Sequence, residues 1–489
     1  MRHSTHARRL ASASIVVVLM VLTGCATYHP RPLSAPANAT QFSHRSLDNA
    51  DLRAFMQAQL GHAMSPWPPK AWTLDQLTVA ALHYHPKLAL ARAQWASARA
   101  KAITAGAYPN PTLNLNPVQY ATNAAAGLSP WTVGLAVDMP ILTAGKRSHR
   151  VAEALDQAEA ARLNVVQTAW QIRANVRQPW IKLYAARRRV QLLDTQVQDA
   201  AALLAALEQR FKAGQTSQYQ VVQARLQRSN AQLSRADARA AENQARASLA
   251  GALGVPLDAL RGLHYDFNAL RKLPAFQKIP RARFKTYALT RRPDIRAALM
   301  RYTASEQAVR LEIARQYPNL NIGPGYTWDQ GAHKWSIGLS LDLPVFNQNQ
   351  GPIAEARAQR QQRAARFRVL QARITTDFNR ALAAYQASAH KLQLAQHLLK
   401  SSQSRLGSAR ASYRAGETNR LDLLRIQLET QTDRLALLKA RVQAEKALGA
   451  LADTVEYPLA RGTPTARAIQ NVAPPQNSSH ARSSKASAS

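Results

Sequence analysis

Residues 108–115 read Tyr-Pro-Asn-Pro-Thr-Leu-Asn-Leu, and residues 317–322 repeat this pattern as Tyr-Pro-Asn-Leu-Asn-Ile. Two further pairs of segments recur in the same order. Val-Asp-Met-Pro at 137–140 matches Leu-Asp-Leu-Pro at 341–344, and Phe-Lys-Ala-Gly at 211–214 matches Tyr-Arg-Ala-Gly at 413–416. The spacing of roughly 200 residues is far longer than a solenoid unit of tens of residues. We therefore interpret the chain as a duplicated half-protein.

Each half predicts the same order of elements: a short helix, two strands, a very long helix, a glycine-containing turn and a returning short helix. The first helix is expected over about 74–106, where Thr73 and Gln76 form a capping-box signal. Its equivalent in the second half is expected over about 284–316. Tyr-Pro-Asn ends each of these helices, because proline disfavours helical conformation in the residue before it.

Two strands are expected in each half. The first half places them at about 112–118 and 131–139, and the second half at about 320–328 and 335–343. Apolar and small or polar residues alternate along them, and strands of about nine residues with a period of two suit a membrane-spanning sheet. A soluble hairpin with one buried face is the alternative. Trp131 and Trp335 at matching strand starts favour an aromatic girdle at a membrane surface.

The longest helices are expected between residues 146 and 213 and between residues 352 and 415, and each would reach about 100 Å. Pro179 should kink or locally open the first of them. The returning helices, at about 217–253 and 419–451, are only half as long. The two short helices of each half should therefore stack end to end beside the long one, giving a helical rod with strands at one end.

The N-terminus predicts a lipoprotein. Three arginines precede a short apolar run that ends in Leu-Thr-Gly-Cys at 22–25, and the run is too short to span a bilayer. Small residues before Cys25 resemble a lipobox, in which the cysteine carries covalent lipid, including palmitate, after cleavage. An ordinary signal peptide with an incidental cysteine is the alternative. Ala26, rather than aspartate, favours the outer membrane over the inner one.

The expected organisation has six parts. They are a signal peptide (1–24), a lipid anchor and tether (25–72), a first repeat (73–255), an inter-repeat linker (256–283), a second repeat (284–455) and a disordered tail (456–489).

The net charge is +36, from 64 Lys and Arg against 28 Asp and Glu. Nucleic-acid binding is disfavoured, because the charges are scattered along helix faces and an exported lipoprotein does not meet nucleic acid. Attraction to anionic lipid is the alternative. We find no catalytic motif and expect no enzyme. His83 and His85 do not share a helix face, and His390 and His397 lack an evident carboxylate partner, so no metal site or cofactor is expected beyond the lipid on Cys25.

Four strands cannot close a barrel, and lipid does not tolerate unpaired strand edges. The chain must therefore form an oligomer that shares one barrel. Two copies would supply 8 strands and fill the interior with side chains, whereas three copies would supply 12 and leave a passage.

The duplicated layout, the lipobox, Tyr-Pro-Asn before each strand pair and Ala-Gly at each helix tip resemble the TolC-like outer membrane factor family. Within the matching region, residues 140–147 and 343–351 resemble the heavy-metal efflux branch, which serves resistance-nodulation-division pumps. The resemblance implies a homotrimer with a 12-stranded barrel above a helical tunnel. It also implies a periplasmic membrane fusion (adaptor) protein, an inner-membrane pump and outer membrane lipid as partners.

The resemblance also suggests a gate at the periplasmic tips. The family's acidic gate position matches Asp422, with Glu417 nearby, whereas Arg425 departs from a second expected acid and could pair with Asp422. The first-half equivalent of Asp422 is Gln220, and Gly214 and Gly416 form the two tip turns. The alternative for Asp422 is a plain helix-start signal with Asn419, as Ser217 and Gln220 would form.

The expected function is a passive, gated outer membrane duct of a tripartite efflux pump, with heavy-metal cations as the implied cargo. Drug efflux or type I protein secretion through the same architecture is an alternative. A non-conducting structural lipoprotein of the periplasm is an alternative of another class.

Overall fold

The computed structural model describes residues 27–122, 127–271, 273–456 and 464–474. The chain divides into two units, Met1–Arg45 and Ser46–Ser489. The described part of the first unit contains helix α2 (Ala35–Ser43), which Ser34 caps by accepting a hydrogen bond from the Ala37 N–H. The predicted signal peptide and Cys25 lie outside the described residues.

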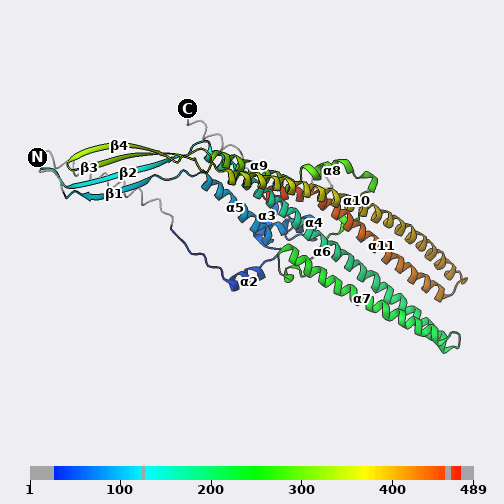
Figure 1. Cartoon of the computed structure of the whole chain (residues 1–489). Helices are drawn as coiled ribbons and strands as arrows, with labels where there is room; N and C mark the ends of the chain where they lie inside the picture. Colours follow the sequence, from blue (N-terminus) through cyan, green and yellow to red (C-terminus); the bar gives the residue numbers. More distant parts are fainter. Residues whose placement is uncertain (1–26, 123–126, 272, 457–463, 475–489) are drawn as a thin grey trace. The chain divides into compact units, whose positions relative to one another are not determined.

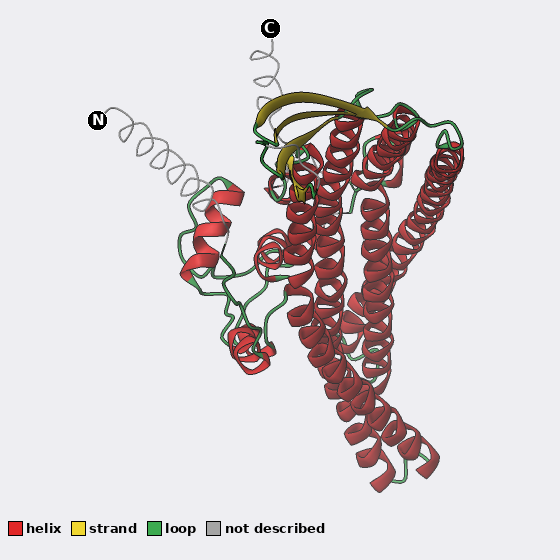
Figure 2. Ribbon diagram, turned by 60° about the vertical axis from the view of Figure 1, so that its left-hand side comes forward, coloured by secondary structure: helices red, strands yellow, loops and turns green. Residues whose placement is uncertain are grey.

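The second unit is a bundle of long helices with a sheet at one end and two helix turns at the other (Figures 1 and 2). Its helices are α3 (Ala50–Leu60), α4 (Leu74–Tyr84), α5 (Pro86–Gly106), α6 (Lys146–Lys212), α7 (Gln218–Leu253), α8 (Arg281–Thr290), α9 (Pro293–Ala314), α10 (Gln350–Arg414), α11 (Arg420–Val455) and α12 (Pro464–Asn471). Short 3-10 turns cross the linker between the halves, at Leu257–Leu260, Asn268–Arg271 and Phe276–Lys278.

The strands are β1 (Thr112–Tyr120), β2 (Trp131–Ile141), β3 (Leu320–Asp329) and β4 (Ala332–Leu341). They form one antiparallel sheet in the order β1-β2-β3-β4. Each half contributes one hairpin, and β2 pairs with β3 to join the hairpins. The predicted four strands per chain are confirmed, and the sheet unites the duplicated halves.

Helix lengths agree with end-to-end stacking. In the first half, α4, α5 and α7 hold 11, 21 and 36 residues beside the 67 of α6. In the second half, α8, α9 and α11 hold 10, 22 and 36 residues beside the 65 of α10. Each first helix is broken once, which the sequence reading over 74–106 and 284–316 missed. His85 and Arg292 adopt non-helical backbone because Pro86 and Pro293 follow them.

The expected opening of the first long helix is not observed, because α6 runs unbroken through Pro179. Pro179 is buried, and its neighbours Val176, Trp180 and Ile181 belong to the largest apolar cluster of the described residues. Packing on both sides holds the helix together where proline removes a backbone hydrogen bond. The capping box of Thr73 and Gln76 forms as predicted, with both reciprocal hydrogen bonds present.

The prediction of a disordered tail over 456–489 is wrong for residues 464–474. Helix α12 packs against α3, α4 and α6, and Ala468 and Ile469 are completely buried. Thr465 Oγ1 donates a hydrogen bond to Asp75 Oδ1 at 2.5 Å. Residues 46–72 were likewise read as tether, yet Leu52 and Met56 of α3 are buried in the same cluster. Each of the two segments has few apolar residues, but its short helix gathers them on one face.

The helices of the second unit follow a simple lateral order. Near the sheet, α6 packs between α5 and α9, and near the tips it packs between α7 and α11. Helix α10 packs on α9 and then on α11. The wall therefore has one flank made by α5 and α7 and the other made by α10.

Candidate functional site

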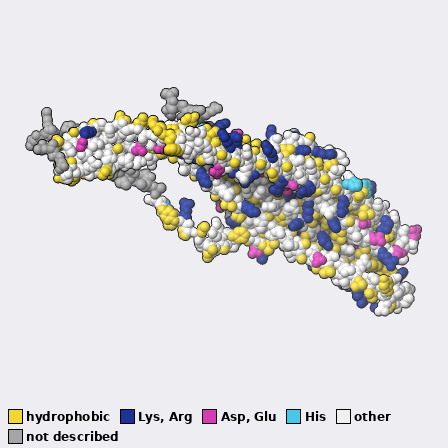
Figure 3. All heavy atoms as spheres, viewed as in Figure 1, with side chains coloured by type: hydrophobic (Ala, Val, Ile, Leu, Met, Phe, Trp, Pro, Cys, Tyr) yellow, Lys and Arg dark blue, Asp and Glu magenta, His cyan; other side chains and the backbone are white. Residues whose placement is uncertain are grey.

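The sheet has one apolar face and one polar face. The strand register places Leu115, Leu135, Tyr326 and Trp335 in one row across all four strands. Neighbouring rows on this face carry further apolar residues, and Trp335, Ile337 and Leu339 are among its most exposed side chains. Figure 3 shows that charged side chains gather over the helices and are sparse over the sheet. A two-faced sheet with little charge suits lipid on one side and water on the other.

The polar face carries its own hydrogen bonds. Asp329 accepts one from Thr132 Oγ1 at 2.6 Å and pairs with Lys334 Nζ at 2.5 Å. Gly134 lies in the next row, where a Cβ would come within 2.8 Å of the Asn116 side chain. Small residues therefore let polar side chains lie flat across this face.

The junction between the sheet and α6 is cross-linked by the first basic residues of the helix. Lys146 Nζ donates to Tyr317 O at 2.5 Å and to Asn319 Oδ1 at 2.6 Å, so it binds the repeat segment of the other half. Arg147 Nε donates to Gly106 O at 2.7 Å and its guanidinium lies 4.1 Å from the centre of the Tyr108 ring. The basic residues after Gly145 thus satisfy helix-end carbonyls and hold the two halves together.

The second half uses different chemistry at the equivalent junction. Asn349 caps α10 in the left-handed conformation, with φ 61°, as Gly145 caps α6 with φ 70°. The Asn349 side chain donates to the Glu312 backbone and carboxylate oxygens, at 2.7 and 2.9 Å. Both junctions therefore need a residue that tolerates positive φ before the long helix.

The tip between α6 and α7 is a glycine turn. Gly214 has φ 73°, and the Gln215 N–H donates to Arg210 O at 2.8 Å, which closes the end of α6. The expected cap by Ser217 is wrong, since its side chain makes no capping hydrogen bond. Thr216 instead donates through Oγ1 to Gln220 Oε1. Gln220 is exposed one turn into α7.

The tip between α10 and α11 has the same turn, with Gly416 at φ 78° and the Glu417 N–H donating to Ser412 O at 2.9 Å. Glu417 is exposed at the extreme end. Asn419 caps α11: its Oδ1 accepts from the Asp422 N–H at 3.0 Å and its Nδ2 donates to Asp422 Oδ2 at 2.7 Å. The helix-start role of Asp422 is therefore confirmed.

Asp422 also pairs with Arg425, whose Nη1 lies 3.7 Å from Asp422 Oδ1. Both side chains are about half exposed. Glu429 continues the same face of α11 and pairs with Arg405 of α10. The adjacent face of α11 is buried against α6 and α7 through Leu421, Leu424 and Leu428. The charged face is thus fixed in orientation by the apolar one.

A groove of about 820 Å³ lies near the tips, between the helix pair α6 and α7 on one side and helix α11 on the other. It brings together Gln220 of α7 with Arg425 and Glu429 of α11. Asp422 and Glu417 do not line it. The structure therefore joins Gln220 and Arg425 in one groove, whereas Asp422 lies just outside it, paired with Arg425, and Glu417 lies at the exposed tip.

The far end of α11 is held by buried ion pairs that sequence reasoning missed. Arg177 of α6 binds Asp453 and donates to Gly449 O at 2.8 Å. Arg292 binds Asp294 at 2.7 Å and Glu456 at 3.0 Å. Burial raises the pKa of Glu456 to about 8, against the opposing effect of Arg292. Isolated Arg, Asp and Glu in helical sequence give no signal that they meet across the bundle.

The histidines do not converge. His85 caps α5 by accepting from the Lys87 N–H at 3.2 Å, and His83 lies against the Phe55 ring. His390 and His397 are exposed on α10. Within the described ranges, no cluster of three or more His, Cys, Asp or Glu side chains could hold a metal ion. Searched over the same residues, none of the helices is apolar for long enough to cross a bilayer.

Comparison with known proteins identifies both halves. The family model of the outer membrane efflux protein matches residues 77–255 and 286–455. The cobalt-zinc-cadmium resistance protein CzcC of Cupriavidus metallidurans is 28% identical over 296 residues, which cover 60% of this chain and 69% of CzcC. The pyoverdine export outer membrane protein OpmQ of Pseudomonas aeruginosa is 25% identical over 484 residues, covering 90% of this chain and 97% of OpmQ.

The fold is similar to that of a solved outer membrane protein, VceC from Vibrio cholerae. The two structures have a TM-score of 0.62 at 19% identity, over 78% of this chain and 95% of VceC. This likeness confirms the predicted fold of long helices joined to a four-stranded sheet. Both family-model segments begin in the short helix of a half and end with its returning helix.

Proposed function

Because this chain belongs to the outer membrane efflux protein family, we propose that it is the outer membrane duct of a tripartite pump that exports divalent heavy-metal cations. The chain is an outer membrane efflux channel, and this family is not one of enzymes. Family members work as trimers with an adaptor and an inner-membrane pump. The metal cargo, a resistance-nodulation-division pump as partner and the lipid anchor are the proposed parts.

The single observation that supports a duct is the two-faced, four-stranded sheet continued by a helical wall. The α6 helix of 67 residues is about 100 Å long, far more than a membrane anchor requires. The edge strands of the sheet, β1 and β4, are unpaired within one chain and require partner strands in lipid. Three copies of the chain supply them and close the ring.

The heavy-metal cargo rests on two features. The first feature is the similarity to CzcC, which is by name a cobalt-zinc-cadmium resistance protein. The aligned region covers 69% of the length of CzcC. The second feature is the resemblance of residues 140–147 and 343–351 to the heavy-metal efflux branch. Within the first segment, Lys146 and Arg147 bind the junction of sheet and helix. The second candidate is export of an organic molecule such as a siderophore, which the similarity to OpmQ supports.

Cargo is tested by deleting the gene and measuring tolerance of the cells to cobalt, zinc, cadmium and a panel of drugs. Loss of metal tolerance, restored by the gene on a plasmid, is expected. Unchanged metal tolerance together with loss of drug tolerance or of siderophore export would assign the duct to the alternative cargo.

The gate is assigned to Asp422, with Arg425 as its counter-charge. Three copies of Asp422 around the channel axis would attract cations and repel one another, because like charges placed close together resist ionisation. The ion pair with Arg425 at 3.7 Å reduces that repulsion. The capping contact with Asn419 and the gate are compatible, since one carboxylate oxygen binds each partner.

The gate is tested by conductance of the purified protein in planar bilayers. Arg425→Gln should raise the open fraction and the cation preference, whereas Asp422→Asn should lower the cation preference. Arg225→Gln is the matched control. It breaks an exposed ion pair, at 3.2 Å, between Arg225 of α7 and Glu208 of α6. If all three variants conduct alike, Asp422 is a helix cap and no gate.

Lipid attachment is assigned to Cys25, the only cysteine of the chain. Radiolabelled palmitate should enter the wild-type protein and be absent from Cys25→Ser. Equal labelling of the two proteins would contradict the assignment.

A further inference from the structure

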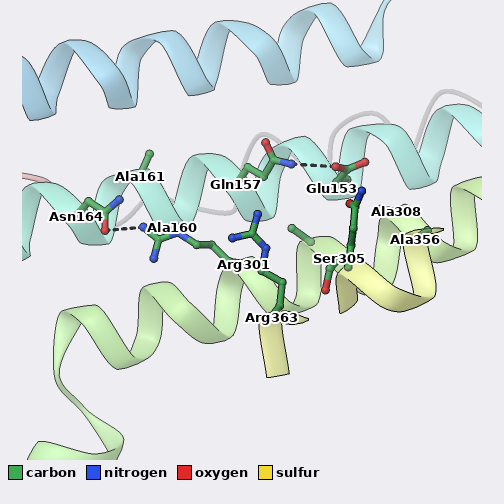
Figure 4. Close-up of a pocket in the computed structure, with 12 residues that line it drawn as sticks. Glu153, Gln157, Ala160, Ala161, Asn164, Arg301, Ser305, Ala308, Ala356 and Arg363 are labelled. Carbon is green, nitrogen blue, oxygen red and sulfur yellow. Dashed lines mark hydrogen bonds between the residues drawn. The ribbon is translucent and has the colours of Figure 1, made fainter. Parts of the chain in front are cut away.

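Three helices from both halves enclose a pocket of about 360 Å³ (Figure 4). Helix α6 contributes Gln157 and Asn164, α9 contributes Arg301, and α10 contributes Arg363. Most of the remaining lining residues are alanines. Figure 4 shows both guanidinium groups pointing into the same space between the helices.

Arg301 is held in this space by a neutral partner. Its Nη2 donates to Asn164 Oδ1 at 2.9 Å. Burial lowers the pKa of Arg301, and the neighbouring charge of Arg363 lowers it further. Arg301 is half-buried and Arg363 is exposed, and the charge of Arg363 is close enough to act on Arg301.

Arg363 has no carboxylate partner among the described residues. The single acid that lines the pocket is Glu153, which accepts a hydrogen bond from Gln157 at 2.9 Å. Burial and the nearby Glu312 raise the pKa of Glu153, so its charge is itself disfavoured. The pocket therefore contains two arginines, and neither forms an ion pair with a carboxylate of the described residues.

In a ring of identical copies, the helix of the neighbouring protomer that would face this flank carries no acid either. In a closed ring of identical walls, the α10 flank of one copy must meet the α5 flank of the next. Helix α5, Pro86–Gly106, contains two Lys and two Arg and neither Asp nor Glu. An anion from solution or from lipid is then the available counter-charge for this pair of arginines.

We propose that this pocket binds a phosphate-type oxyanion, held by Arg301 and Arg363 with the amides of Gln157 and Asn164 as neutral neighbours. A guanidinium presents paired donors that match two oxygens of a phosphate group. The bound anion relieves the repulsion between α9 and α10 and connects the second half of the chain to α6. Its source is either free phosphate or the headgroup of a phospholipid.

The test uses the full-length protein purified as its trimer and inorganic phosphate as the probe. Binding is measured by equilibrium dialysis in chloride buffer at constant ionic strength. Arg363→Gln should weaken phosphate binding about tenfold or more, the loss expected for a charged hydrogen bond. Arg368 is, like Arg363, an exposed arginine of α10, but it does not line the pocket, so Arg368→Gln should bind phosphate as the wild type does.

A second arm distinguishes the sources. Phosphatidylglycerol bound per protomer is measured after purification, for the wild type and both variants. Lipid retained by the wild type and by Arg368→Gln, but lost from Arg363→Gln, assigns the anion to a headgroup. Phosphate binding without such retained lipid assigns it to the free ion. Equal behaviour of the two variants in both arms overturns the site, and the elution volume of the trimer verifies that each variant is assembled.

Discussion

Glu445 of α11 is a buried acid, and one of its carboxyl oxygens lacks a hydrogen-bond partner among the described residues. That oxygen is Oε1, and burial raises the pKa of Glu445 to about 8, although Arg441 and Arg177 oppose the shift. The folded state therefore holds a proton on Glu445 that the unfolded chain releases at lower pH. The stabilising effect of this proton is complete below about pH 4.5 and is lost as pH rises toward 8.

Glu445→Gln should make unfolding less dependent on pH. The variant is expected to melt several degrees above the wild type at pH 8.5, with little difference at pH 4.5, because glutamine never acquires the buried charge. Thermal melts of both proteins across this range measure it. A constant offset between the two curves would contradict the titration of Glu445.

Gly449 shows how closely α11 approaches α6. A Cβ on Gly449 would lie 2.7 Å from Nε of Arg177, a side chain already fixed by Asp453 and by Gly449 O. Gly449→Ala should therefore destabilise the protein by about 1–3 kcal/mol. Gly407→Ala is the control, since nothing lies within 4 Å of its added Cβ. That change should stabilise α10 by about 0.5–1 kcal/mol, and denaturant titration measures both.

Single residues were predicted well where the signal is local. The Asn419 and Asp422 contact and the Thr73 and Gln76 box involve positions three residues apart on one helix, and both form. The Ser217 side chain does not cap α7, and the Gln220 N–H donates instead to the backbone oxygen of Ser217 at 3.1 Å. The contact of Arg177 with Asp453 joins distant positions of the chain, which a single sequence does not connect.

At the scale of elements, α12 shows what composition hides. Residues 456–489 are rich in Ser, Ala and Pro, yet α12 places Ala468 and Ile469 in the core, and Val472 and Ala473 directly after it are buried there too. Ile469→Ala should cost about 2 kcal/mol or more and expose α12 to limited proteolysis. Gln470→Ala changes an exposed neighbour and should leave both readouts unchanged. Equal proteolysis of the two variants would show that α12 does not dock through Ile469.

Strand and long-helix positions followed from periodicity and from the repeat, whereas the breaks at His85 and Arg292 depended on weighing one proline against a long helical pattern. The opposite error occurred at Pro179, where surrounding core residues keep α6 continuous. A proline signal in isolation does not say whether tertiary packing compensates for it.

At the scale of the whole molecule, the sheet must present its apolar face to lipid in every copy of the ring. Ile337→Lys places a charge on that face and should cost about 2–4 kcal/mol per protomer near the bilayer centre. Ser336→Lys changes the adjacent residue on the polar face and should be tolerated. Recovery of trimer from outer membrane fractions distinguishes them, and equal recovery would contradict the assigned faces.

The trimeric channel was predicted from the need to close strand edges and from the family resemblance. The charge pattern at the flanks was not predicted, because the sequence does not say which helices lie at the edge of the wall. Contacts of α5 with α6 and of α9 with α10 settle that order.

The buried ion pairs at the end of α11 have a mechanical consequence. Arg177 and Arg292 hold that end in place, so a tilt of α11 moves its other end while the held end stays fixed. Asp422 lies near the other end of this 36-residue helix, so a tilt of about 5° about the fixed end carries Asp422 roughly 4 Å sideways. Small rearrangements far from the mouth are therefore amplified at the mouth.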